Sequence, residues 1–127
     1  MELSIVVPVY RSAECLPELA RRVQQALDGH IGTYELILVN DASPDASWRA
    51  IAALVNTYPF VVGLNLRKNV GQDNAIMAGL HHAKGATVVI MDDDLQHDPA
   101  DVPALARALG SEFDVVYATF EHKHQAL

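Results

Sequence analysis

Five short apolar runs rich in β-branched residues alternate along this chain with segments that repeat apolar residues at helical spacing. The runs cover residues 3–10, 34–40, 60–66, 86–92 and 113–119. Runs that are apolar almost throughout are typical of parallel strands covered on both faces. The alternation therefore predicts an α/β fold with an open, mainly parallel sheet and helices on both faces.

Four helices are predicted between these strands. Their apolar stripes lie within residues 16–27, 48–55, 76–83 and 99–109. We expect Ser43 or Asp45 to cap the second helix and Asn69 the third, because short polar side chains accept hydrogen bonds from free N–H groups. Pro103 leaves the start of the fourth helix open, because proline is accommodated only in a first turn.

Composition excludes several classes of protein. The 127 residues include 16 acidic and 9 basic ones, a net charge of −7, which argues against a general binder of nucleic acid or anionic membranes. Half of the residues are apolar, so we expect one domain with a sizeable core. The single Cys15 fits a reducing compartment. With no signal peptide or membrane-spanning stretch recognised, we expect a cytoplasmic location, and action at the cytoplasmic face of a membrane stays open.

The acidic triplet at 92–94 is the strongest chemical signal, because it ends a buried apolar run. Ligands of open α/β sheets bind outside the carboxyl ends of the strands. If the strand continues, Asp92 and Asp94 point to one side and Asp93 to the other. Carboxylate oxygens suit Mg²⁺ or Mn²⁺, which are often shared with substrate phosphates. The alternative is a solvated acidic loop in which Asp98 caps the next helix, but the strand end favours the metal site.

Two other strand ends carry candidate binding residues. Asp41 ends the second run, where it could accept from a nucleobase or sugar hydroxyl, or form an Asx turn with Ser43. Gly71 leaves the backbone bare where the third helix begins, and a helix N-terminus attracts phosphate. Arg67 and Lys68 are the local cations, although single basic residues are most often ordinary surface charge.

Several segments match one known family in order and spacing across nearly the whole chain. They read IVVPVYRSAE (5–14), LILVNDAS (36–43), RKNVGQDNAIMAGL (67–80), AKGATVVIMDDDLQHDP (83–99) and FDVVYA (113–118). In these segments the chain resembles the family 2 glycosyltransferases of the Rossmann-like GT-A fold. The closer likeness is to the polyprenyl-phosphate (dolichol- or undecaprenyl-phosphate) glycosyltransferases.

The resemblance implies roles for individual residues. Pro8 and Tyr10 match positions that line the nucleotide pocket, and Asp41 matches the carboxylate that reads the base. Asp92 and Asp94 match the pair that holds Mg²⁺ or Mn²⁺ against the diphosphate, with Gln96 in the metal shell. The expected donor-binding set is therefore Pro8, Tyr10, Asp41, Arg67, Gly71 and Asp92, and the expected metal ligands are Asp92, Asp94 and Gln96. Asp93 stands where a small residue is common, as a spare or a competing ligand.

The resemblance also implies a function. It indicates a metal-dependent glycosyltransferase domain that binds a nucleotide-diphosphate sugar for transfer to a polyprenyl phosphate or a glycan acceptor in cell-envelope glycan biosynthesis. Family members continue further, so we expect residues 1–127 to be the donor-binding half, without the acceptor half and with doubtful activity alone. Sugar and base stay open, as does a homo-oligomer, because an absent half would leave an apolar face.

Other functions fit the sequence less well. A non-catalytic nucleotide-sugar-binding or assembly module stays open as the main alternative. A receiver-like signalling domain needs acidic residues where the first strand ends, and this chain has PVYR there. A dinucleotide-dependent oxidoreductase needs a glycine-rich turn at that place, and VPVYRSAEC contains no glycine, so this class is excluded.

Overall fold

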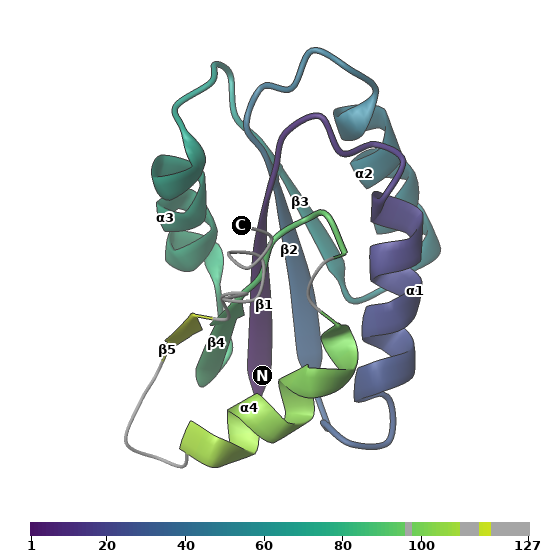
Figure 1. Ribbon diagram of the computed structural model, residues 1–127, viewed down its shortest axis with the longest axis vertical. Helices are drawn as coiled ribbons and strands as arrows, with labels where there is room; N and C mark the ends of the chain where they lie inside the picture. The colour runs from purple at the N-terminus through teal and green to yellow at the C-terminus, as the bar shows by residue number, and fades with distance from the viewer. Residues whose placement is uncertain (96–97, 110–114, 118–127) are drawn as a thin grey trace, which may run out of the picture.

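The computed structural model describes residues 1–95, 98–109 and 115–117, and these form an open α/β sheet with helices on both faces (Figure 1). The sheet has five strands in the order β3-β2-β1-β4-β5, and every neighbouring pair is parallel. The strands are β1 (Leu3–Val9), β2 (Tyr34–Asn40), β3 (Val61–Asn65), β4 (Thr87–Ile90) and β5 (Val115–Tyr117). The predicted fold class is confirmed.

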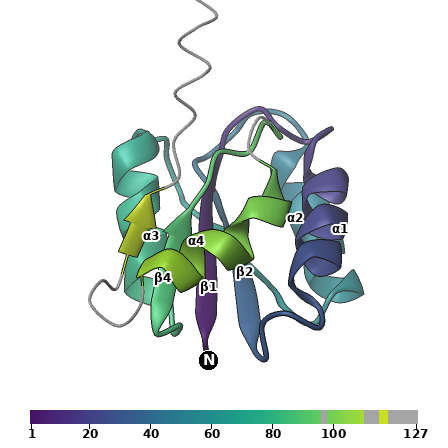
Figure 2. The ribbon, with the colours of Figure 1, turned by 60° about the horizontal axis from the view of Figure 1, so that its bottom comes forward.

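The helices divide between the two faces of the sheet. They are α1 (Leu16–Leu27), α2 (Ser47–Thr57), α3 (Gln72–His82) and α4 (Val102–Leu109), with the 3₁₀ turn η1 (Pro99–Asp101) before α4. Figures 1 and 2 show α1 and α2 on one side of the sheet and α3 on the other. Residues of α4 pack into the same apolar cluster as α1 and α2. No helix within the described ranges is long and apolar enough to cross a bilayer.

The strand β1 lies at the centre of the sheet and is buried along its whole length. Ile5 and Val7 belong to the apolar cluster under α1 and α2, whereas Val6 belongs to the cluster under α3. Helix α3 approaches the sheet through Gly79, where a Cβ atom would overlap the side chain of Val6. Burial on both faces explains why the strands read as continuous apolar runs.

The helix starts differ in part from the predicted caps. Ala46 precedes α2, and the carboxylate of Asp45 accepts from the Ser47 N–H at 3.0 Å. Gly71 precedes α3, so the predicted cap at Asn69 is wrong. Proline at 103 lies in the first turn of α4, where its missing N–H and fixed φ are tolerated.

The strand order creates a topological switch point between β1 and β4. The chain runs from β1 outward to β2 and β3 on one side, and then crosses to β4 and β5 on the other. In open α/β sheets, the crevice outside the carboxyl ends of the two strands at such a point is the usual ligand site. The loops that follow β1 and β4 are therefore the first place to look for a site.

Candidate functional site

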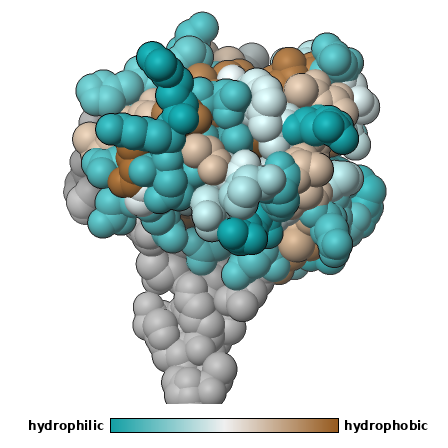
Figure 3. All heavy atoms as spheres, turned by 90° about the horizontal axis from the view of Figure 1, so that it is seen from above, coloured by the Kyte–Doolittle hydropathy of each residue, from teal (hydrophilic) through white to brown (hydrophobic). Residues whose placement is uncertain are grey.

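A cavity of about 340 Å³ lies at this switch point. Its lining comes from the ends of β1 and β2, the loop after β4 and the start of α3: Pro8, Val9, Tyr10, Asp41, Asn69, Gly71, Gln72, Asp92 and Asp93. Figure 3 views the molecule from above, and the surface seen there is mainly hydrophilic with scattered apolar residues. A polar cavity at the carboxyl edge of a parallel sheet suits a charged or strongly hydrogen-bonding ligand.

The cavity brings together five of the residues predicted for the donor-binding set: Pro8, Tyr10, Asp41, Gly71 and Asp92. Arg67 is exposed and is not among the lining residues. Asp94 is also exposed and outside the lining, two residues beyond Asp92. Gln96 lies outside the described residues.

The loop after β1 presents Tyr10 to the cavity. The Tyr10 side chain is 44% exposed, and the Arg11 guanidinium lies over its ring, 5.4 Å from the centroid. The Arg11 N–H donates to Ser43 Oγ at 2.8 Å, and the Ser12 N–H donates to Ser47 Oγ at 3.1 Å. These two bonds fasten the backbone of this loop to Ser43 and Ser47, at the start of the segment that forms α2.

The carboxylate of Asp41 fixes the loop that leads into α3. Asp41 is only 4% exposed, and its Oδ1 accepts from the Val70 N–H at 2.8 Å. Its Oδ2 accepts from the Gly71 N–H and from Asn69 Nδ2, both at 3.1 Å. The Asn69 side chain therefore donates to Asp41 and does not cap helix α3. The base-reading role expected of Asp41 stays a prediction, and the structure adds this loop-holding role.

The middle residue of the acidic triplet points back to the loop after β1. Asp93 Oδ2 accepts from the Tyr10 N–H at 3.2 Å and from the Ser12 hydroxyl. Burial raises the pKa of Asp93 above its ordinary value, and the hydrogen bonds from Ser12 and Tyr10 oppose that shift without cancelling it. The strand does not continue through the triplet, because β4 ends at Ile90, so the alternation expected of a continued strand does not apply; Asp92 and Asp93 both line the cavity.

The donor chemistry of the triplet fits a hard divalent cation. Asp92 lines the cavity, and its carboxylate and that of Asp94 are of the type that binds Mg²⁺ or Mn²⁺. The described ranges contain no group of three or more His, Cys, Asp or Glu side chains that could hold a metal ion. Carboxylates of this type often bind Mg²⁺ together with substrate phosphates, which complete the metal's shell.

Backbone strain gathers around the same cavity. Arg11, Ala42 and Leu95 have φ values of 55°, 55° and 63°, and they are the non-glycine residues with positive φ in the described part of the chain. Each lies in a loop that follows a strand contributing to the cavity, namely β1, β2 or β4. Such conformations cost about 1–3 kcal/mol each and persist where surrounding contacts enforce them, which is typical of functional sites.

Sequence reasoning missed some members of the site. Val9 also lines the cavity but is not one of these, because it lies at a strand end where a ligand is expected. Gln72 also lines the cavity, from the first residue of α3, and no motif separates it from other polar surface residues. Ser12 was not singled out either, although it contacts Asp93.

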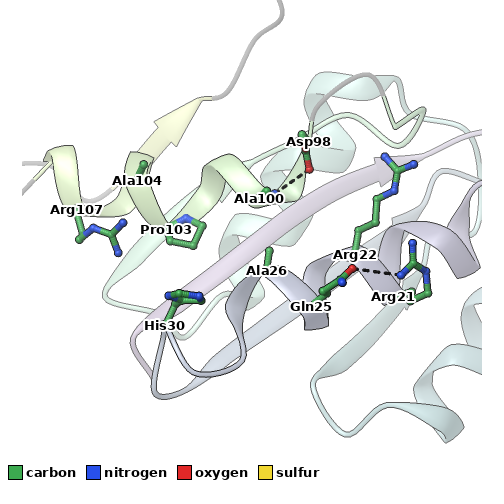
Figure 4. A pocket seen from close by; sticks show the side chains of 10 residues that line it. All are labelled: Arg21, Arg22, Gln25, Ala26, His30, Asp98, Ala100, Pro103, Ala104 and Arg107. Carbon is green, nitrogen blue, oxygen red and sulfur yellow. Dashed lines mark hydrogen bonds between the residues drawn. The ribbon is translucent and has the colours of Figure 1, made fainter.

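A larger cavity of about 660 Å³ lies between α1 and the segment of η1 and α4. Figure 4 shows its lining side chains, which include Arg21, Arg22 and Arg107. Arg21 and Arg22 pair with Glu18 on α1, at 2.6 and 2.8 Å. None of the residues predicted for binding or metal ligation lines this cavity, so the smaller cavity at the switch point is the candidate site.

Comparisons with known proteins agree with this geometry. Proteins from Sodalis glossinidius and Pseudomonas fluorescens, both named undecaprenyl-phosphate 4-deoxy-4-formamido-L-arabinose transferase, are 40% and 44% identical to this chain over 116 residues. The matches cover 91% and 90% of this chain but 36% and 34% of those proteins. The chain thus spans about a third of the length of these relatives.

A solved structure and a family model extend the comparison. The mannosyltransferase PcManGT from Pyrobaculum calidifontis, solved in complex with GDP-Man and Mn²⁺, matches with a TM-score of 0.70 and 26% identity over 85% of this chain and 31% of that chain. The model of the family described as Glycosyl transferase family 2 matches residues 4–126. That match spans the sheet, the switch-point cavity and the acidic triplet, and on this ground the chain belongs to glycosyl transferase family 2.

Proposed function

We propose that residues 1–127 form a single donor-binding domain that holds a nucleotide-diphosphate sugar with Mg²⁺ or Mn²⁺ for glycosyl transfer. The observation that carries the proposal is the cavity at the switch point, which gathers Tyr10, Asp41 and Asp92 from three different strand ends. Membership of family 2 supports the same reading, because the expected donor residues fall within the matched range of 4–126.

The nucleoside end of the donor fits the side of the cavity formed by β1 and β2. The exposed Tyr10 ring offers an apolar face to a base, and the buried Pro8 lines the same cavity. Asp41 holds the loop at residues 69–71, which also lines the cavity, by three hydrogen bonds. We propose that Asp41 also accepts a hydrogen bond from the base, because a carboxylate has about four lone-pair sites.

The diphosphate end fits the side formed by the acidic triplet and the start of α3. Asp92 and Asp94 would hold the metal, and Gln96 remains a predicted third ligand. Bound there, the metal supplies Lewis-acid stabilisation of the charge that builds on the leaving nucleoside diphosphate. The N-terminus of α3, entered through Gly71 with φ 93°, adds a positive dipole end beside the phosphates.

The acceptor proposed for the whole protein is a lipid phosphate, with a glycan as the second choice. The support is that the two relatives are named undecaprenyl-phosphate 4-deoxy-4-formamido-L-arabinose transferases. An acceptor of this kind would bring the domain to the cytoplasmic face of a membrane. We assign no residue of this chain to the acceptor, because the relatives are about three times as long.

The proposal is tested by thermal melts of the chain with Mn²⁺ and either UDP or GDP. Nucleotide at about 100 times its dissociation constant stabilises the fold by about 2.7 kcal/mol, which should raise the melting temperature by several degrees. The rise should vanish with chelator and in Asp94→Ala, but persist in the control Asp101→Ala, which removes an exposed carboxylate on η1. No metal-dependent rise with either nucleotide would overturn the proposal.

A transfer assay with a sugar nucleotide and a polyprenyl phosphate separates binding from catalysis. We expect this chain to bind the donor and to transfer the sugar poorly, because positioning the second reactant contributes about 7–11 kcal/mol in favourable cases. The same assay can be run on a protein that contains this chain and is as long as the relatives. If that protein binds the sugar nucleotide but transfers no sugar, the result would instead favour the non-catalytic nucleotide-sugar-binding module.

A further inference from the structure

Asp93 connects two loops that are distant in sequence but adjacent at the switch point. Its Oδ2 accepts from the Tyr10 N–H at 3.2 Å, across 83 positions of the chain, and also from the Ser12 hydroxyl. The loop at residues 10–12 is held on its other side by Ser43 and Ser47. Asp93 therefore provides the tie from the β4 side, between the acidic triplet and the backbone of the Tyr10 loop.

The tie matters because the loop is strained and its tyrosine is exposed. Arg11 has a φ of 55°, which a non-glycine residue keeps only when neighbouring contacts enforce it. One enforcing contact is the bond from Tyr10 N–H, the residue before Arg11, and another is the bond from Ser12, the residue after it. Asp93 thus accepts hydrogen bonds from the residues on both sides of Arg11.

The same hydrogen bonds argue against a metal ion at Oδ2 of Asp93. A carboxylate oxygen has about two lone-pair sites, and Oδ2 of Asp93 accepts two hydrogen bonds. A cation at that oxygen would have to displace Tyr10 or Ser12. Asp92, one residue earlier, lines the cavity and carries a carboxylate of the type that binds Mg²⁺ or Mn²⁺.

We propose that Asp93 is a positioning residue that holds the Tyr10 loop in its ligand-binding conformation, and that the acidic triplet divides into two metal-binding carboxylates, Asp92 and Asp94, and one loop-holding carboxylate. The proposal rests on the proposed function for the ligand it names. It predicts that Asp93 acts on binding of the nucleoside and leaves binding of the diphosphate and metal unchanged.

Calorimetry with two probes tests that division. The probes are UDP or GDP with Mn²⁺, which engage the whole site, and pyrophosphate with Mn²⁺, which engages the metal side alone. Asp93→Ala should weaken nucleoside diphosphate binding about 5- to 10-fold, the equivalent of one or two ordinary hydrogen bonds, and leave pyrophosphate binding unchanged. Asp93→Asn should retain wild-type binding of both, because its amide oxygen can accept the same two bonds.

Two further variants complete this design. Ser12→Ala removes one of the two donors and should give a smaller loss with the same selectivity for the nucleoside probe. Asp94→Ala should weaken both probes. An equal loss of both probes in Asp93→Ala, without rescue by Asp93→Asn, would overturn the proposal and identify Asp93 as a metal ligand.

Amide hydrogen exchange followed by NMR tests the tie without any ligand. The Tyr10 amide should exchange at least about 10-fold faster in Asp93→Ala than in the wild type, because its acceptor is gone. It should keep its wild-type rate in Asp93→Asn and in the control Asp101→Ala. Unchanged exchange in Asp93→Ala would overturn the tie itself. Failure of the wild type to bind any nucleotide would overturn the proposed function and leave this measurement to decide the role of Asp93.

Discussion

Replacing Asp41 by alanine is the sharpest test of how the site is built. The carboxylate is 4% exposed and accepts three hydrogen bonds, from Asn69, Val70 and Gly71. Hydrogen bonds to a charged group contribute about 1.5–3 kcal/mol each when buried. Asn69 and Gly71 are exposed, so water can replace the aspartate for these two, whereas Val70 is half-buried. We therefore expect Asp41→Ala to lower the free energy of unfolding by about 2–4 kcal/mol.

Urea denaturation at neutral pH measures this loss. Asp41→Asn keeps one acceptor oxygen but turns an NH₂ group toward the loop donors, so it should lose about half as much, roughly 1–2 kcal/mol. The slope of the free energy against urea should be unchanged in both variants. Asp101→Ala is the control, since it removes an exposed carboxylate on η1. A loss below about 0.5 kcal/mol in Asp41→Ala, the size of an ordinary surface change, would refute the loop-holding role.

Three further predictions concern the surroundings of the site. Hydrogen bonds from Ser43 and Ser47 lower the pKa of Asp45 from 3.8 to about 2. The contribution of Asp45 to stability is therefore present above pH 3.8 and is lost as the pH falls toward 2. The difference in unfolding free energy between the wild type and Asp45→Asn should shrink over that range. Tyr10→Ala should weaken nucleoside diphosphate binding by about 1–3 kcal/mol in calorimetry and spare pyrophosphate, while Tyr10→Phe should match the wild type, because the proposed contact is stacking. Gly79→Ala should lower stability by about 1–2 kcal/mol in urea, because overlap with β1 outweighs the gain of about 1 kcal/mol in helix propensity.

The strands were the most predictable part of the fold. The second run was expected at 34–40, and β2 spans Tyr34–Asn40. Burial on both faces makes such strands apolar throughout, so their ends coincide with the first polar residues. The start of α3 was expected directly after Asn69, whereas the helix begins at Gln72. Its first turn is polar and exposed, so no apolar stripe marks it.

The strand order could not be predicted from the alternation alone. Five parallel strands separated by helices are compatible with several strand orders. The apolar runs show that both faces of each strand are buried, but they do not show which strands are neighbours in the sheet. The observed order β3-β2-β1-β4-β5 places β4 beside β1, and this pairing brings the acidic triplet next to Tyr10. The members of the site were therefore predictable as strand ends, but their mutual contacts were not.

The roles of the acidic residues show why sequence reasoning stops where it does. A carboxylate at a strand end is equally suited to bind a cation and to accept backbone N–H groups from a neighbouring loop. Asp41 and Asp93 both accept backbone N–H groups, from Val70 and Gly71 in one case and from Tyr10 in the other. The deciding quantity is which donors the fold brings within about 3 Å, and that depends on strand order and loop conformation. Acidic residues near a ligand site are therefore assigned by the donors around them, and we propose that the triplet of this chain contains both kinds.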